Sequence, residues 1–212
     1  DFIDGAPVSR AVSGALAAIG LPVAFRFDAE HVTVINAGTI ILLQVLVSRI
    51  VKRLPAVPTM VAGMLIGGVG FLLLASSHSP WVFVAGIAVF SIGEMTAHPK
   101  YYSFVGLVAP ADRKAVYMGY AFLYGVFGSL LGSNLGAFLY TRMLKPAAGA
   151  PGAFAASRTF WLMFAALDVL AAIGLILFAR AFSADTPETR RKARVVMGGV
   201  YAVILLVGLA FC

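Results

Sequence analysis

The chain has 212 residues, of which 61% are hydrophobic and 12% are charged, and its formal net charge is +7. Soluble domains carry about 45–50% apolar and about 25% charged residues, so this composition excludes an ordinary soluble domain. The single cysteine, Cys212, excludes an internal disulfide framework and a cysteine-based metal cluster. The apolar residues form long runs separated by short polar segments, which predicts an all-α, multi-pass integral membrane protein.

Residues 1–30 lack the length and the unbroken apolarity of a membrane span. Residues 8–19 are expected to form a short amphipathic helix with Arg10 on its polar side, and Pro22 interrupts the pattern. We interpret this part as an interfacial segment or as the remnant of a preceding helix. The chain begins with Asp1 and shows no signal peptide, so we expect it to be a piece of a longer protein.

Six transmembrane helices are predicted, at residues 31–50, 58–76, 81–98, 115–140, 159–182 and 195–212. The first five are expected to form one bundle over residues 31–182. A basic cytoplasmic linker, residues 183–194, then leads to an additional, truncated helix. Pro99 and Lys100 are expected to end the third helix, and residues 144–157 to form a mobile loop.

Small residues recur on two of these helices. One set lies in the second span and the other in the fourth, namely Gly63, Gly67 and Gly70, and Gly128, Gly132 and Gly136. Such spacing lets helix backbones approach closely within lipid, so we expect both faces to pack against neighbouring helices. For the fourth span, close packing is also compatible with a helix that flexes.

Basic residues predict the orientation. Eleven Lys and Arg residues fall on the side of the loops after the first, third and fifth spans, and five fall on the other side. The positive-inside rule places the richer side in the cytoplasm. Because the basic residues lie between apolar runs, we expect them to orient the chain in a bilayer and not to bind nucleic acid. The expected location is a bacterial cytoplasmic (inner) membrane.

Glu94 is an acid in the middle of an apolar run, where a charge costs about 2.5–3.5 kcal/mol on insertion scales. Such acids usually face a polar cavity and often mark a transport pathway, although a purely structural bond to a neighbouring helix is the alternative. His98 follows four residues later and therefore shares its helix face. Asp168 is a second intramembrane acid, which serves function or structure and has a serine or Asn134 as a possible partner.

Enzyme signatures are missing from the sequence. It has no HExxH, GxSxG or Walker motif, and Glu94 with His98 gives only two ligands, too few for a metal site. The segment GMLIGGVG lies in an apolar helix and follows no strand, so it is not read as a dinucleotide-binding loop. We therefore expect no enzymatic activity, no cofactor and no metal.

The segment GEMTAHPKYYSFVGLVAPADRKAVYMGYAFLYGVFGSLLG, residues 93–132, resembles the second half of proton-coupled oligopeptide transporters, a branch of the major facilitator superfamily. The stretches INAG and RLPAVPTMVAGMLIGGVGFLLLA are similar to the family's eighth and ninth helices, and the resemblance covers about residues 30–182. It implies a carboxy-terminal transporter bundle whose substrate cavity forms against a missing amino-terminal bundle. It also implies that Glu94 meets the amino group of the substrate and that Asn36 contacts the substrate backbone.

The predicted function is secondary active transport of a small solute, as proton-coupled symport of a peptide or another amine-bearing compound. Glu94 and Asn36 are the candidate substrate-binding residues, and Asp168 and His98 are candidates for proton coupling or structure. Ser129 to Ser133 are expected to lie across the same cavity. The alternatives are an exporter of drugs or cationic solutes and a membrane scaffold that transports nothing. The expected partners are the solute, protons and the lipid bilayer.

Overall fold

The structure, a computed structural model, describes residues 5–21, 24–27 and 31–181. The predicted linker at residues 183–194 and the predicted sixth span at residues 195–212 lie outside this part. Every element in the described ranges is helical: α1 (Ala6–Ala18), α2 (His31–Val51), α3 (Ala56–Ser76), α4 (Pro80–Val108), the 3-10 turn η1 (Ala111–Arg113), α5 (Lys114–Leu139), the π-helical turn η2 (Tyr140–Leu144), α6 (Lys145–Ala147) and α7 (Ala153–Ala181). The all-α prediction is confirmed for these residues.

Five helices are long and apolar enough to cross a membrane, namely α2, α3, α4, the continuous segment Ala111–Ala147 and α7. Their outer surfaces carry large apolar side chains, such as Ile41 and Leu42, which are 78% and 79% exposed. Such a surface suits lipid and not water. The 21 residues of α2 extend about 31 Å at about 1.5 Å per residue, close to the thickness of the hydrocarbon core. The chain is a multi-pass membrane protein, and five of the six predicted spans are present as helices.

The predicted end of the third helix at Pro99 and Lys100 is wrong, because α4 continues to Val108 with Pro99 inside it. Proline removes one backbone donor, so it leaves only the carbonyl of Met95 without its usual helical partner. Membrane helices tolerate that loss where neighbouring groups compensate. The ten residues 99–108 therefore extend the α4 helix instead of forming a loop.

The predicted mobile loop at residues 144–157 is also mostly helical. Helix α6 ends at Ala147 and α7 begins at Ala153, so only residues 148–152 connect them. Leu144 and Ser157 are buried, and the ring of Phe154 lies 3.9 Å from that of His78. This segment packs against the connection between α3 and α4, which its Ala, Gly and Pro content did not reveal. That it is mobile stays a prediction.

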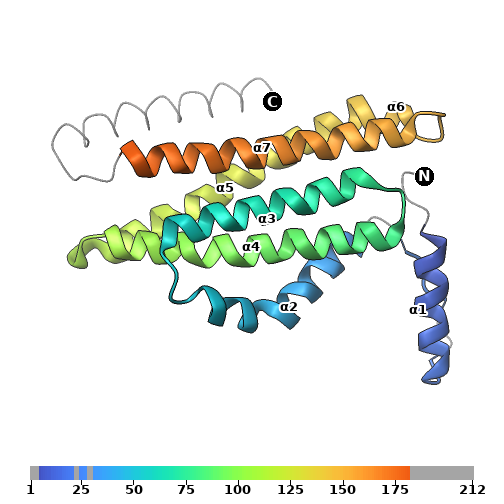
Figure 1. The fold of residues 1–212 in the computed structure, drawn as a ribbon, viewed down its shortest axis with the longest axis horizontal. Coiled ribbons are helices and arrows are strands. Elements are labelled where there is room, and N and C mark those ends of the chain that lie inside the picture. Colours follow the sequence, from blue (N-terminus) through green and yellow to red (C-terminus); the bar gives the residue numbers. More distant parts are fainter. Residues whose placement is uncertain (1–4, 22–23, 28–30, 182–212) are drawn as a thin grey trace.

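The centre of the bundle is the antiparallel hairpin of α3 and α4 (Figure 1). Its two backbones touch where glycines meet. A Cβ atom added to Gly93 would lie 2.5 Å from the carbonyl oxygen of Gly63 and 2.5 Å from the nitrogen of Gly67. A Cβ on Gly70 would lie 2.7 Å from the nitrogen of Phe90. The predicted close packing of the glycine face in the second span is confirmed.

The other helices flank this hairpin: α2 packs against α4, and α7 packs against α3, whereas α5 touches α4 over a small area (Figure 1). Gly128, Gly132 and Gly136 were predicted to pack in the fourth span. Apart from the backbone of their own helix and their chain neighbours, no atom of the described residues lies within 4 Å of a Cβ position at any of them. Their predicted packing is therefore absent from this part of the chain. A face of small residues is thus filled by a neighbouring helix on α3 and is open on α5.

The predicted amphipathic helix near the N-terminus is present as α1, which runs across the direction of the long helices in Figure 1. Two serines one turn apart hold it to residues 24–27. The hydroxyl of Ser9 accepts the N–H of Phe27 at 2.8 Å, and that of Ser13 accepts the N–H of Phe25 at 2.9 Å. The backbone N–H groups of Phe25 and Phe27 thus find acceptors on one face of α1.

Lys100 is buried, with 6% of its surface exposed, and its ammonium group binds the end of α2. The Nζ atom donates to the carbonyl oxygens of Lys52 at 3.2 Å and Leu54 at 2.8 Å. A cation is favourable there because the last carbonyls of a helix lack partners and carry the negative end of its dipole. Lys100 therefore fixes the turn between α2 and α3 to α4.

Replacing Lys100 with Met is expected to lower the free energy of unfolding by about 1–3 kcal/mol. Methionine keeps much of the apolar stem but removes the buried ammonium group that donates to the carbonyls of Lys52 and Leu54. The midpoint of denaturant-induced unfolding in detergent measures the effect, with the exposed Lys114→Met as a control that should change little. Equal midpoints for the two variants would show that Lys100 does not hold the turn.

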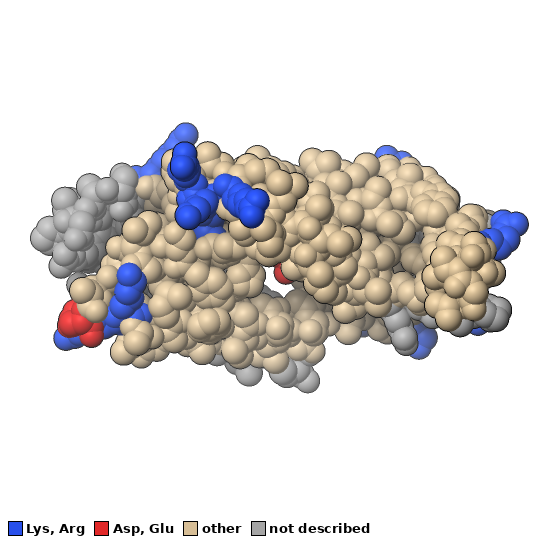
Figure 2. Space-filling model, turned by 90° about the horizontal axis from the view of Figure 1, so that it is seen from below, with Lys and Arg blue, Asp and Glu red and all other residues tan. Residues whose placement is uncertain are grey.

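The long helices alternate in direction, so the basic residues separate to two ends as predicted. Arg49, Lys52, Arg53, Lys100, Arg113, Lys114 and Arg180 lie toward the end where α2 and α7 finish, and Figure 2 shows some of these cations in blue. The remaining five, Arg10, Arg26, Arg142, Lys145 and Arg158, belong to the opposite end. This arrangement supports the expected orientation.

A cysteine placed at Lys114 is expected not to react with a membrane-impermeant maleimide added to intact cells, because the positive-inside rule places this end in the cytoplasm. The background variant is Cys212→Ser, which removes the only native thiol. A cysteine at Lys145, on the opposite end, serves as the positive control and should be labelled. Strong labelling at position 114 would reverse the orientation.

Candidate functional site

The two acids predicted to lie within the membrane occur halfway along their helices. Glu94 is residue 15 of the 29 in α4 (94 − 80 + 1), and Asp168 is residue 16 of the 29 in α7 (168 − 153 + 1). Both side chains are partly buried. If these helices cross a bilayer, both carboxyl groups therefore lie near the middle of the hydrocarbon layer, where an unpaired charge is most costly.

Gly67 of α3 lies close to Asp168 and to the residue that precedes Glu94. The Oδ2 atom of Asp168 is 2.9 Å from the position that a Cβ on Gly67 would occupy, so a side chain there would displace the carboxyl group. On its other side, Gly67 touches Gly93, the residue before Glu94. The hairpin thus brings Asp168 and Glu94 to the same level of the bundle. Asn134, suggested as a partner of Asp168, instead donates to the carbonyl of Leu130 in its own helix at 2.7 Å.

Asn36 of α2 lies beside the helical turn of α4 that precedes Glu94. Its Oδ1 atom is 2.5 Å from the hydroxyl of Ser91, which is fully buried and also lies 2.8 Å from the carbonyl oxygen of Ile87. A hydroxyl has one proton, so these two acceptors share it. The amide oxygen of Asn36 is thus already used within the protein, and the contact fastens α2 to α4.

His98 contacts α5 through a tyrosine. The hydroxyl of Tyr124 is 3.1 Å from Nε2 and 3.3 Å from Nδ1 of His98, so a hydrogen bond joins the two side chains. Glu94 lies one helical turn before His98 on the same face of α4. The structure therefore joins His98 of α4 to Tyr124 of α5, one turn from Glu94.

Two more tyrosines lie close to Tyr124, and the sequence analysis did not identify them. The ring centroid of Tyr101 lies 4.8 Å from that of Tyr124, and the centroid of Tyr102 lies 6.3 Å from it. The hydroxyl of Tyr101 donates to the carbonyl of Ala121 at 3.2 Å. We call Tyr101, Tyr102 and Tyr124 the tyrosine cluster. The sequence held one signal for Tyr101 and Tyr102, namely their spacing of seven and eight residues from Glu94. This spacing places them on the same helix face as Glu94 only if α4 continues beyond Pro99, as it does.

No basic side chain of the described ranges lies within ion-pair distance of Glu94 or Asp168. The ion pair found in the described ranges joins the neighbouring residues Arg113 and Asp112 at 3.3 Å. Both are exposed and lie in the turn before α5, away from the two acids. In Figure 2, red atoms appear at one end of the molecule and at a hollow near its middle. Ser129 and Ser133, expected opposite Glu94, are exposed on α5. That they line one cavity with Glu94 stays a prediction.

No protein-family model matches this chain, and neither a curated protein nor a solved structure is similar to it at the level required for a match. We therefore infer the function from the residues of this chain and from their arrangement.

Proposed function

We propose that this chain is the carboxy-terminal bundle of a major facilitator transporter in a bacterial inner membrane. It moves a peptide or another amine-bearing solute together with protons, against an amino-terminal bundle of the same protein. The observation that carries the proposal is the pair of mid-helix carboxyl groups, Glu94 and Asp168, without a basic partner in the described ranges. Acids in such positions are costly and serve as substrate sites or proton relays in transporters.

The chemistry of Glu94 explains how solute and proton movement become linked. In a poorly hydrated site, a carboxylate is stabilised by an ammonium group through charge-assisted hydrogen bonds. When the amine leaves, the bare charge is unfavourable, and binding of a proton removes it. Exchange at this one carboxyl group would by itself move amine and proton in opposite directions. Symport therefore needs a second group, Asp168 or His98, that carries a proton while the amine occupies Glu94.

Other residues of the candidate site have proposed roles set by their contacts. Because the Oδ1 atom of Asn36 already accepts from Ser91, its amide N–H₂ is the part that reaches a solute carbonyl. His98, bonded to Tyr124, passes protons between Glu94 and the end of α4. Asp168 carries a second proton or holds α7 to α3 at Gly67. The proposal is transport and not catalysis, and it needs no cofactor.

The second candidate is an exporter of drugs or other cationic solutes. The tyrosine cluster beside Glu94 favours it, because aromatic faces attract organic cations, including those that cannot donate a hydrogen bond. A membrane scaffold without transport is the third candidate, and for it both acids should be replaceable without consequence.

Uptake by the full-length protein in liposomes tests the proposal. An inward proton gradient should drive accumulation of a labelled dipeptide, whereas a neutral sugar of similar size should not accumulate. Proton-driven loss of a preloaded lipophilic cation, without dipeptide uptake, would favour the exporter. Neither movement, from correctly inserted protein, would contradict transport of either class.

A further inference from the structure

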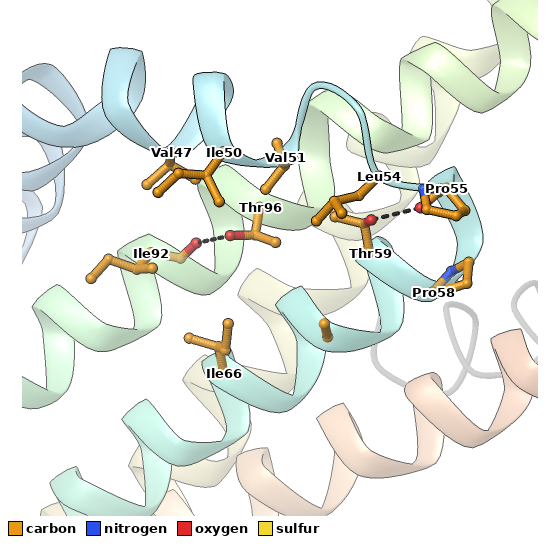
Figure 3. A pocket seen from close by; sticks show the side chains of 11 residues that line it. Val47, Ile50, Val51, Leu54, Pro55, Pro58, Thr59, Ile66, Ile92 and Thr96 are labelled. Carbon is orange, nitrogen blue, oxygen red and sulfur yellow. Dashed lines mark hydrogen bonds between the residues drawn. The ribbon is translucent and has the colours of Figure 1, made fainter.

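An apolar groove of about 430 Å³ lies on α4, between the end of α2 and the start of α3. Figure 3 shows the 11 side chains that line it. Nine are aliphatic or proline, including Ile50, Leu54, Ala62 and Ile92, and the other two are threonines. Its volume falls within the range of about 300–1,000 Å³ that is typical of small-molecule sites.

The two threonine hydroxyls do not make this groove polar. The Oγ1 atom of Thr59 donates to the carbonyl of Pro55 at 2.6 Å, and that of Thr96 donates to the carbonyl of Ile92 at 2.8 Å, as the dashed lines in Figure 3 show. Pro55 and Pro58 have no N–H to offer. The groove therefore presents methyl and methylene groups, which suit a hydrocarbon chain and not a polar solute.

The groove is distinct from the candidate transport site. With about 100° per residue, Glu94 points about 200° away from Ile92 around α4. His98 is likewise about 200° away from Thr96. The two surfaces lie on opposite sides of one helix, so the inference drawn from the groove does not depend on the proposed function.

Cations stand at one end of the groove. Lys52 and Arg53 lie between the lining residues Val51 and Leu54, and both are exposed. No carboxylate of the described ranges lies within ion-pair distance of either. Lys100 binds the carbonyls of Lys52 and Leu54, so the turn that carries these cations is held in place. The turn that borders the apolar groove thus carries two exposed positive charges and is fixed to α4.

We propose that this groove binds an anionic phospholipid of the surrounding bilayer. One acyl chain lies along the apolar lining, and the phosphate is held by Lys52 and Arg53. The basic end of the bundle is the expected cytoplasmic end, where anionic lipids concentrate and where basic pockets between membrane helices bind their headgroups. The two cations attract the phosphate, and the apolar lining contacts the acyl chain. Together they favour a lipid over a free phosphate.

Native mass spectrometry of the full-length protein tests this proposal by titration with phosphatidylglycerol and, separately, phosphatidylcholine. The intact protein should retain phosphatidylglycerol preferentially. The double variant Lys52→Gln/Arg53→Gln should bind it about 30-fold more weakly, because each cation near an anionic surface contributes about fivefold. Ala62→Phe, which fills the groove, should reduce binding of both lipids. Arg113→Gln/Lys114→Gln removes the same charge from the same end and should leave affinity unchanged.

Four results would overturn the proposal. Equal affinity for both lipids, or equal losses in the two double variants, would show that general surface charge explains binding. Competition by soluble glycerophosphate as strong as by the whole lipid would show that the groove is not used. Loss of a dimer in Ala62→Phe, without a change in lipid binding, would show that a second copy fills the groove. Unfolding midpoints of all variants confirm that each remains folded.

Discussion

Gly93→Ala is expected to destabilise the α3–α4 hairpin strongly, and more than the same substitution at Gly132 in α5. The added Cβ would lie 2.5 Å from two backbone atoms of α3, and backbone cannot rotate aside as a side chain can. The helices must separate, which removes contacts along the glycine face. Overpacking of this kind costs about 1–3 kcal/mol and occasionally more. The midpoint of denaturant-induced unfolding in detergent measures it.

Gly132→Ala is the matched control, because it makes the same chemical change in α5. There, apart from the nearby backbone of α5 itself and the chain neighbours, no atom of the described residues lies within 4 Å of the Cβ position. Alanine is favoured over glycine within a helix by about 1 kcal/mol, so this variant should be neutral or slightly more stable. If both variants lose stability equally, helix flexibility and not the contact between backbones would be the common cause.

Glu94→Gln should weaken binding of an amine-bearing solute at least about 30-fold. Glutamine keeps the shape and one acceptor oxygen but removes the charge that pairs with the ammonium. Loss of one partner of a buried, hydrogen-bonded charge pair costs about 2–5 kcal/mol, or a factor of about 30 and upward in affinity. Isothermal titration of the purified protein with a dipeptide measures the change.

Two further variants distinguish the loss of a site from the loss of any charge. Asp112→Asn removes the same charge at an exposed position beside Arg113 and should bind the solute normally. Asp168→Asn should have a smaller effect than Glu94→Gln if Asp168 mainly holds α7 against Gly67. Equal losses for Glu94→Gln and Asp168→Asn would make the two acids one functional unit.

The spans and the tight glycine face of α3 could be predicted because both depend on local pattern. An apolar run of about 20 residues makes a membrane helix, and Gly63, Gly67 and Gly70 fall on one face of it. The open glycine face of α5 has the same pattern, so the pattern alone cannot tell which face finds a partner. The predicted end of α4 was wrong because proline is a local signal for a helix end, whereas a membrane helix can continue through a proline.

The candidate site was only half visible in the sequence. Glu94, His98 and Asp168 stand out because charged or titratable groups are rare in such runs. Their surroundings depend on pairings between helices that no spacing encodes, such as Ser91 with Asn36, 55 residues apart, and Tyr124 with His98, 26 apart. Lys100 was assigned to a loop for the same reason, since its partners are carbonyls near residues 52 and 54.

The most direct test of the central claim follows proton entry into liposomes that contain the full-length protein and an internal pH-sensitive dye. An inward dipeptide gradient should acidify the interior with the intact protein and with Asp112→Asn. Liposomes with equal amounts of inserted Glu94→Gln should show no solute-driven acidification. Acidification by Glu94→Gln at the rate of the intact protein would contradict the assignment of the coupled site to Glu94.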